Sequence, residues 1–269
     1  MLLSLIAVAC YLSGALGLAV AAYRGDSHHG RGMCIAAVAI AAVGILVHGM
    51  ALLEERRLAP QAALSLGDTA AIVGLVIAVT ATLLAFRPRM RGMAALLLGI
   101  AALLEAAFSE GARQFSIGRP GWELSFHVAV ATTAFAFLTI GAALAIAQVV
   151  VDRRLRSRKP LGWLRILTPV ESLESGCFQS ILAGFSLLTL ALVSGAFFIE
   201  NLFAQHLVHK VVLAIVAWFV FGELLLGRWR FGWRGRKAMN WTIAGYGLLG
   251  LSYFGSKFVL EHFLGLHWG

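Results

Sequence analysis

Long apolar runs alternate with short polar segments along the whole chain. Eight of these runs reach or approach the roughly 20 residues that a helix needs to cross the hydrocarbon core of a bilayer. Backbone groups in lipid must find their hydrogen bonds within the protein, which favours helices over irregular chain. The pattern therefore predicts an all-α, polytopic membrane protein with transmembrane helices at approximately 1–23, 32–53, 67–86, 92–108, 125–151, 179–199, 208–226 and 240–264.

The composition supports this class and excludes a water-soluble domain. Of the 269 residues, 60% are hydrophobic and only 13% are charged, whereas a soluble domain carries about 25% charged residues. The first run lacks the positively charged start of a cleaved signal peptide, so we expect it to remain as a helix. We interpret residues 1–269 as a single membrane domain.

The positive residues predict how the helices are oriented. The net charge is +9, but the cations stand in short clusters between apolar runs, as in membrane proteins, so we expect contact with lipid and no nucleic-acid partner. Of the 22 Lys and Arg residues, 16 fall in the connections after the first, third, fifth and seventh runs, and 5 fall in the other connections. Positive charge marks the cytoplasmic side. Both termini are therefore predicted to be extracytoplasmic, and the longest cytoplasmic loop, 152–178, is predicted to hold an amphipathic surface helix around 163–166.

Histidines gather at the opposite, outer ends of the predicted helices. His127 begins the fifth run, and His48 lies near the outer end of the second. Four more occupy the outer connections or the end of the chain: His206, His209, His262 and His267. Only His28 and His29 are predicted to be cytoplasmic.

Neutral imidazole is a common ligand of iron, copper and zinc. The chain has no His-Glu-x-x-His motif, which argues against a zinc hydrolase. Haem needs less from a protein, because one or two axial histidines, an apolar cleft and a few cations for the propionates are sufficient. Lys210 and four arginines stand on the predicted outer side. A haem held by two histidines at the outer surface is therefore the favoured interpretation.

Other interpretations of the same residues remain open. His48 is as well explained as a hydrogen-bond partner between helices as it is as a ligand. Glu105 and Asp68 are carboxylates within or at the start of apolar runs, and such groups are often functional. Together with His48 they favour a rival hypothesis, a membrane transporter of a small solute or metal ion.

Three stretches resemble the cytochrome c assembly family, the haem-handling membrane proteins typified by CcsA and CcmC. They are "FHVAVATTAFAFLTIGAALAIAQ", "HKVVLAIVAWFVFGELLLGRWRFGWRGRKA" and "YFGSKFVLEHFLGLHWG". The likeness covers residues 120–269, is weaker upstream to about residue 40, and is greatest for the short, eight-helix members of YpjD or HemX type.

The resemblance implies non-covalent, b-type haem, with His127 and His267 as the axial iron ligands. It also gives His48 as the counterpart of a histidine embedded in the membrane in larger members, and it aligns Lys210 and Trp218 with a lysine and a tryptophan of the matched helix. The loop before Lys210, "ENLFAQHLVH", lacks the tryptophans that family transporters carry there. His209 and His206 occupy that loop instead and are candidate substitute ligands.

The resemblance further implies a multi-pass protein of the bacterial inner membrane, with haem and other cytochrome c assembly proteins as partners. A regulatory or scaffolding member that keeps the fold without haem is a third hypothesis, since the tryptophan-rich loop is missing. No nucleophile with an adjacent base, phosphate-binding glycine loop or carboxylate cluster is visible, so we expect no enzymatic activity.

Overall fold

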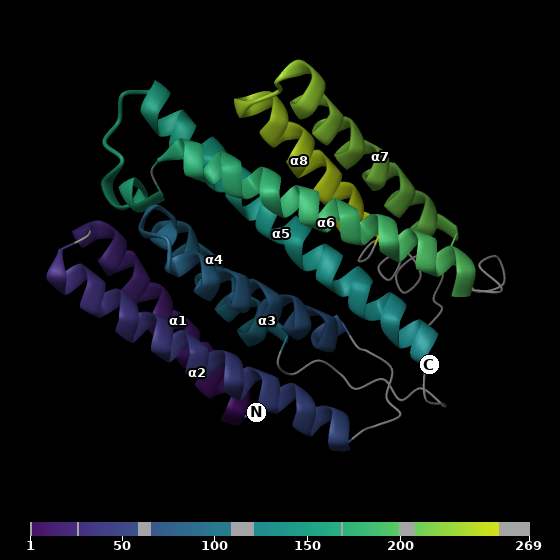
Figure 1. The fold of residues 1–269 in the computed structure, drawn as a ribbon, viewed down its shortest axis with the longest axis horizontal. Helices are drawn as coiled ribbons and strands as arrows, with labels where there is room; N and C mark the ends of the chain where they lie inside the picture. The colour runs from purple at the N-terminus through teal and green to yellow at the C-terminus, as the bar shows by residue number, and fades with distance from the viewer. Residues whose placement is uncertain are drawn as a thin grey trace. The chain divides into compact units, whose positions relative to one another are not determined.

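A computed structural model describes residues 2–25, 27–58, 66–108, 121–167, 169–198 and 208–252. These residues form eight α-helices and two short 3-10 helices, and the described chain contains no β-strand (Figure 1). The α-helices are α1 (Leu2–Arg24), α2 (His28–Leu58), α3 (Leu66–Ala85), α4 (Arg91–Phe108), α5 (Trp122–Arg156), α6 (Val170–Phe198), α7 (Val208–Phe231) and α8 (Gly235–Gly250). The 3-10 helices are η1 (Pro88–Met90) and η2 (Gly162–Leu167).

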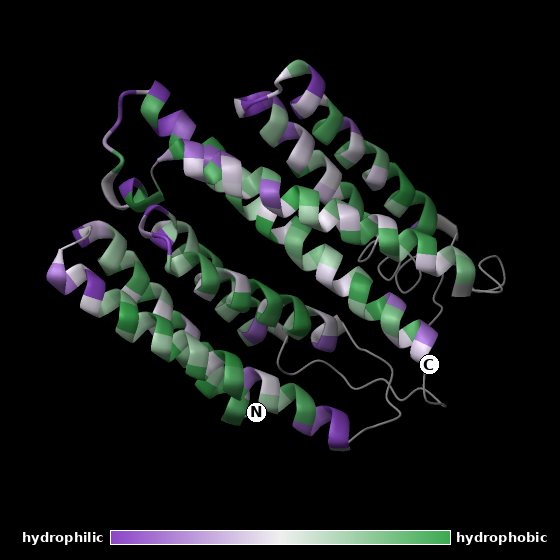
Figure 2. Cartoon of the chain, viewed as in Figure 1, coloured by the Kyte–Doolittle hydropathy of each residue, from purple (hydrophilic) through white to green (hydrophobic). Residues whose placement is uncertain are grey.

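The predicted all-α membrane architecture is confirmed. Within the described residues, α1 to α7 are long and apolar enough to cross a membrane. The eighth predicted span, 240–264, is described only as far as residue 252, and its helix α8 begins at Gly235. Hydrophobic residues run along the lengths of the helices, and most hydrophilic residues lie towards their ends (Figure 2).

Several helices extend beyond the apolar runs that predicted them. α5 continues to Arg156, where Asp152 and the Arg156 guanidinium form an ion pair one helical turn apart, with the Oδ2 and Nε atoms separated by 2.9 Å. α6 begins at Val170, so the loop predicted over 152–178 is largely helical at both ends. The segment around 163–166, predicted as an amphipathic surface helix, forms the short 3-10 helix η2, in which Leu164 and Leu167 are buried.

The chain divides into two compact units. The first comprises residues 1–120 and 150–175, and the second comprises 121–149 and 176–269. In the first unit, α1 contacts α2 and α4, and α3 also contacts α2 and α4, so the four helices form a closed bundle. Its core is built from small and branched side chains, among them Ala41, Ile77, Ala81 and Leu97.

The second unit packs its helices closely at glycines. A side chain at Gly184 on α6 would meet Leu138 of α5, and one at Gly245 on α8 would meet Phe221 of α7. Small residues at such positions let helix backbones approach one another in membranes. The start of α5 and the end of α6 lie together, and His127 lies there.

Candidate functional site

His127 lies in the second turn of α5 and packs against the end of α6. Its Nδ1 atom is 3.0 Å from the Ser194 hydroxyl oxygen. The next residue, Gly195, lies under the imidazole ring, and a Cβ atom there would be 3.0 Å from the Cε1 atom of His127. The ring is therefore held between two short residues of α6 and is only partly exposed.

The hydrogen bonds around Ser194 orient the His127 ring. The Ser194 hydroxyl donates its only hydrogen to the Ala191 carbonyl oxygen, at 3.0 Å. The His127 ring also interacts with the Ala191 backbone. In the tautomer in which Nδ1 carries the proton, the serine oxygen accepts from His127 and Nε2 keeps its lone pair. A histidine that binds a metal through one nitrogen usually donates the other N–H in this way.

Lys210 begins the apolar part of α7 and is near enough to His127 for its positive charge to act on the imidazole. Trp218 lies eight residues further along α7, about 12 Å deeper at the rise of an α-helix. Its indole N–H donates to the Thr189 hydroxyl at 2.8 Å, and its ring stacks on Phe185 with the centroids 5.5 Å apart. Trp218 is thus fixed in the packing between α6 and α7, and His127 and Lys210 are the predicted site residues that lie near each other.

Three other candidate ligands cannot be placed in this site. His267, His262 and His206 lie outside the described residues. The backbone of His209 belongs to the first turn of α7, but its side chain is not described.

His48 occupies a different environment, in the first unit. It is fully buried on α2, and its Nδ1 atom is 3.0 Å from the Tyr11 hydroxyl of α1. Its Nε2 atom is 2.9 Å from the Oε2 atom of Glu105 on α4, a close ion-pair contact whose angle falls outside hydrogen-bond geometry. The Ser4 hydroxyl also interacts with the Glu105 carboxyl group.

Both ring nitrogens of His48 therefore face other side chains. Binding iron through either nitrogen would require that contact to break. The alternative interpretation from the sequence, a hydrogen-bond partner between helices, describes the observed arrangement directly. The candidate site for a ligand accordingly consists of His127, Ser194, Gly195 and Lys210.

The sequence analysis did not identify the hydroxyl groups that bond His127, His48 and Trp218. Ser194, Tyr11 and Thr189 each interrupt an apolar run with a hydroxyl group, and polar groups within transmembrane helices commonly bond to a neighbouring helix. A hydroxyl group within an apolar run therefore predicts that the residue forms a hydrogen bond. It does not predict which side chain is the partner.

Comparison with known proteins identifies the family. Residues 2–264 match the cytochrome C assembly protein family. The chain is 32% identical over 236 residues to the inner membrane protein YpjD of Escherichia coli (strain K12), with 84% of this chain and 86% of that protein covered. It is 27% identical over 160 residues to the cytochrome c biogenesis protein CcsA of Synechococcus sp. (strain CC9902), with 51% and 52% covered. No solved structure matches the chain. The resemblance drawn from the sequence is confirmed, and the chain belongs to the cytochrome c assembly protein family.

Proposed function

We propose that this protein binds haem without a covalent link, through the Nε2 atom of His127, and takes part in cytochrome c biogenesis at the bacterial inner membrane. The single observation that carries the proposal is the hydrogen bond between His127 Nδ1 and Ser194, which leaves Nε2 with its lone pair in the tautomer protonated at Nδ1. Family membership and the printed names of the CcsA and YpjD relatives support the process and the membrane. The role is one of binding, not of catalysis.

The residues around His127 fit a porphyrin ligand. Gly195 leaves room beside the imidazole, where a Cβ atom would make a tight contact of 3.0 Å with the ring. Lys210 supplies a nearby cation for a propionate group. Bound haem would supply an iron that can change its oxidation state. His267 is predicted to be the second residue that would hold the iron.

Absorption spectroscopy tests the proposal. The purified protein is supplemented with haem, and its visible spectrum is compared with that of the His127→Ala/His267→Ala double variant. We expect a Soret band shifted from that of free haem in the wild type, and loss of that band in the double variant. His28→Ala/His29→Ala is the matched control, since it also removes two imidazoles, and both of these side chains are exposed.

The control variant should keep the wild-type spectrum. A wild-type protein without the shifted Soret band, or a double variant with an unchanged one, would contradict the proposal. The His127→Ala single variant is measured as well. The change in its Soret band shows the contribution of His127 separately from that of His267.

A further inference from the structure

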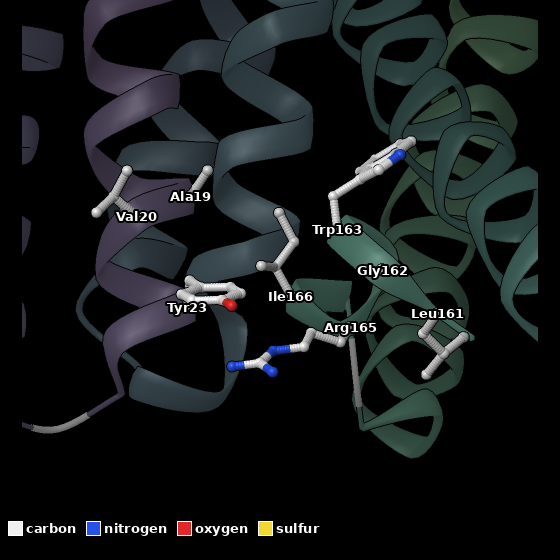
Figure 3. A pocket seen from close by; sticks show the side chains of 8 residues that line it. All are labelled: Ala19, Val20, Tyr23, Leu161, Gly162, Trp163, Arg165 and Ile166. Atoms are coloured by element: carbon white, nitrogen blue, oxygen red, sulfur yellow. The ribbon is translucent and has the colours of Figure 1, made fainter.

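Glu223 on α7 differs from other charged residues that lie among apolar side chains. In the pocket between α1 and η2, the Arg165 guanidinium carbon lies 4.0 Å from the centroid of the Tyr23 ring (Figure 3). In the first unit, the Glu105 carboxyl group has His48 beside it, with Oε2 and Nε2 separated by 2.9 Å. The carboxylate of Glu223 has no ion-pair or hydrogen-bond partner among the described residues.

Glu223 lies on the face of α7 that points away from the packed helices of its unit. The buried face of α7 carries Ala217, Phe221 and Leu224, whose side chains are fully buried, and Gly245 of α8 packs against the Phe221 ring. At 3.6 residues per turn, Glu223 is about 160° round the helix from Phe221. Its side chain is accordingly exposed.

The neighbours of Glu223 on this outward face are apolar. Val212, Phe219 and Leu226 are 51%, 63% and 50% exposed. They precede or follow Glu223 at spacings that place residues on one side of a helix. We call Val212, Phe219, Glu223 and Leu226 the outer stripe of α7. Apart from its one carboxylate, the outer stripe is a surface of the kind that membrane helices turn towards lipid or towards another helix.

The carboxylate also lies well inside the part of α7 that is able to cross a membrane. This part is Lys210–Phe231, so Glu223 is about 20 Å from its first residue and about 12 Å from its last at the rise of an α-helix. The nearest cation along the helix, Arg228, donates to the Trp233 carbonyl oxygen at 3.3 Å and lies over the Phe178 ring at 4.3 Å. Carboxylates at such a depth are costly and are generally paired.

We propose that the outer stripe of α7 is the docking surface for one transmembrane helix of another membrane protein, and that this helix carries a lysine or arginine at the depth of Glu223. The cation pairs with the carboxylate inside the bilayer, and the apolar residues of the stripe pack on the rest of the helix. Charge complementarity selects this partner, because a symmetric contact with a second copy of α7 would bring two carboxylates together. The proposal does not rest on haem binding.

Photo-cross-linking in the native membrane tests the proposal. A photo-reactive benzoylphenylalanine replaces Phe219 in the full chain, in the cells that naturally produce it, and mass spectrometry identifies the cross-linked peptide. We expect a transmembrane helix of another protein that contains a lysine or arginine. Glu223→Gln should lower the yield of this adduct about tenfold, the effect of losing one polar contact between helices in a membrane. Glu171→Gln is the matched control, since it neutralises an exposed carboxylate at the start of α6, outside the stripe.

A charge exchange separates an ion pair from an effect on folding. Glu223→Lys should abolish the adduct, and replacing the cation of the identified helix by glutamate should restore it. The proposal would be overturned by the absence of an adduct at position 219, or by an adduct with a second copy or with another segment of the same chain. A cross-linked helix without a cation, or equal yields in Glu223→Gln and Glu171→Gln, would overturn it as well.

Discussion

His127 and His48 are both histidines of apolar helices, and their neighbours give them different chemistry. His127 has the Ser194 hydroxyl at hydrogen-bond distance from its Nδ1 atom. His48 has Tyr11 at one nitrogen and Glu105 at the other. The sequence predicted that His127 begins the fifth run as a ligand, and it left His48 open between a ligand and a hydrogen-bond partner. It did not predict their hydroxyl partners, because these lie on other helices, as far as 67 positions away in the case of Ser194.

The bond to Ser194 is expected to set the affinity of His127 for haem. Ser194→Ala removes the acceptor for Nδ1–H, so the ring loses its fixed tautomer and orientation. Changes to such supporting residues typically weaken metal binding by about 10-fold to 100-fold, and haem titration followed in the Soret region measures the change.

Ser186→Ala is the control for this experiment. Ser186 lies on the same helix as Ser194 and is exposed, and its hydroxyl donates to the Leu182 carbonyl oxygen within that helix. Its haem affinity should match that of the wild type. Equal affinities in Ser194→Ala and Ser186→Ala would show that the serine does not support the ligand.

The Tyr11–His48–Glu105 cluster is expected to stabilise the first unit. Tyr11→Phe keeps the ring but leaves Nδ1 of the buried His48 without its partner, which should lower the free energy of unfolding by about 1–3 kcal/mol. Tyr23→Phe, on the exposed end of the same helix, should change it little. Denaturation in detergent micelles, followed by circular dichroism, compares the two variants. Equal stabilities would mean that the buried hydrogen bond contributes nothing.

At the scale of helices, the sequence predicted nearly all of the described elements. The length of an apolar run decides whether a segment forms a membrane helix, and this length depends on the sequence of that segment alone. The ends of the helices were less predictable, since α2, α5 and α6 continue into polar sequence. There the helix is extended by local interactions such as the pair between Asp152 and Arg156, which hydropathy does not detect.

The contact between α4 and η2 is expected to depend on a single glycine. Gly92→Ala places a methyl group against the Ile166 carbonyl, so η2 must move away from the bundle. Gly99→Ala is the matched control on the same helix, because its Cβ atom would meet nothing within 4 Å. Limited trypsin digestion should cleave the segment around residues 153–165 faster in Gly92→Ala than in Gly99→Ala. The same rate in both would contradict this packing.

At the scale of the whole molecule, the sequence predicted the class and the family, and both are confirmed. The division into two compact units was not predicted, because it depends on contacts between distant segments such as 150–175 and the first four helices. The orientation in the membrane stays a prediction, and it rests on the 16 cations counted on one side.

Cysteine labelling tests this orientation. Trp122→Cys at the start of α5 and Lys159→Cys beyond its end are introduced, one at a time, into a protein whose native cysteines have been replaced. Both positions are exposed. In intact cells an impermeant maleimide should label position 122 and should reach position 159 only after the cells are opened. The reverse pattern would place His127 on the cytoplasmic side.

The central claim is that the His127 imidazole binds haem iron, and ligand rescue tests it most directly. His127→Gly removes the imidazole and leaves a space between α5 and α6 that a free imidazole molecule can fill. The account predicts that His127→Gly loses the wild-type Soret band and that added imidazole restores it, whereas the Ser194→Ala protein gains less from the same addition. A His127→Gly protein that keeps the wild-type haem spectrum without imidazole would contradict the account.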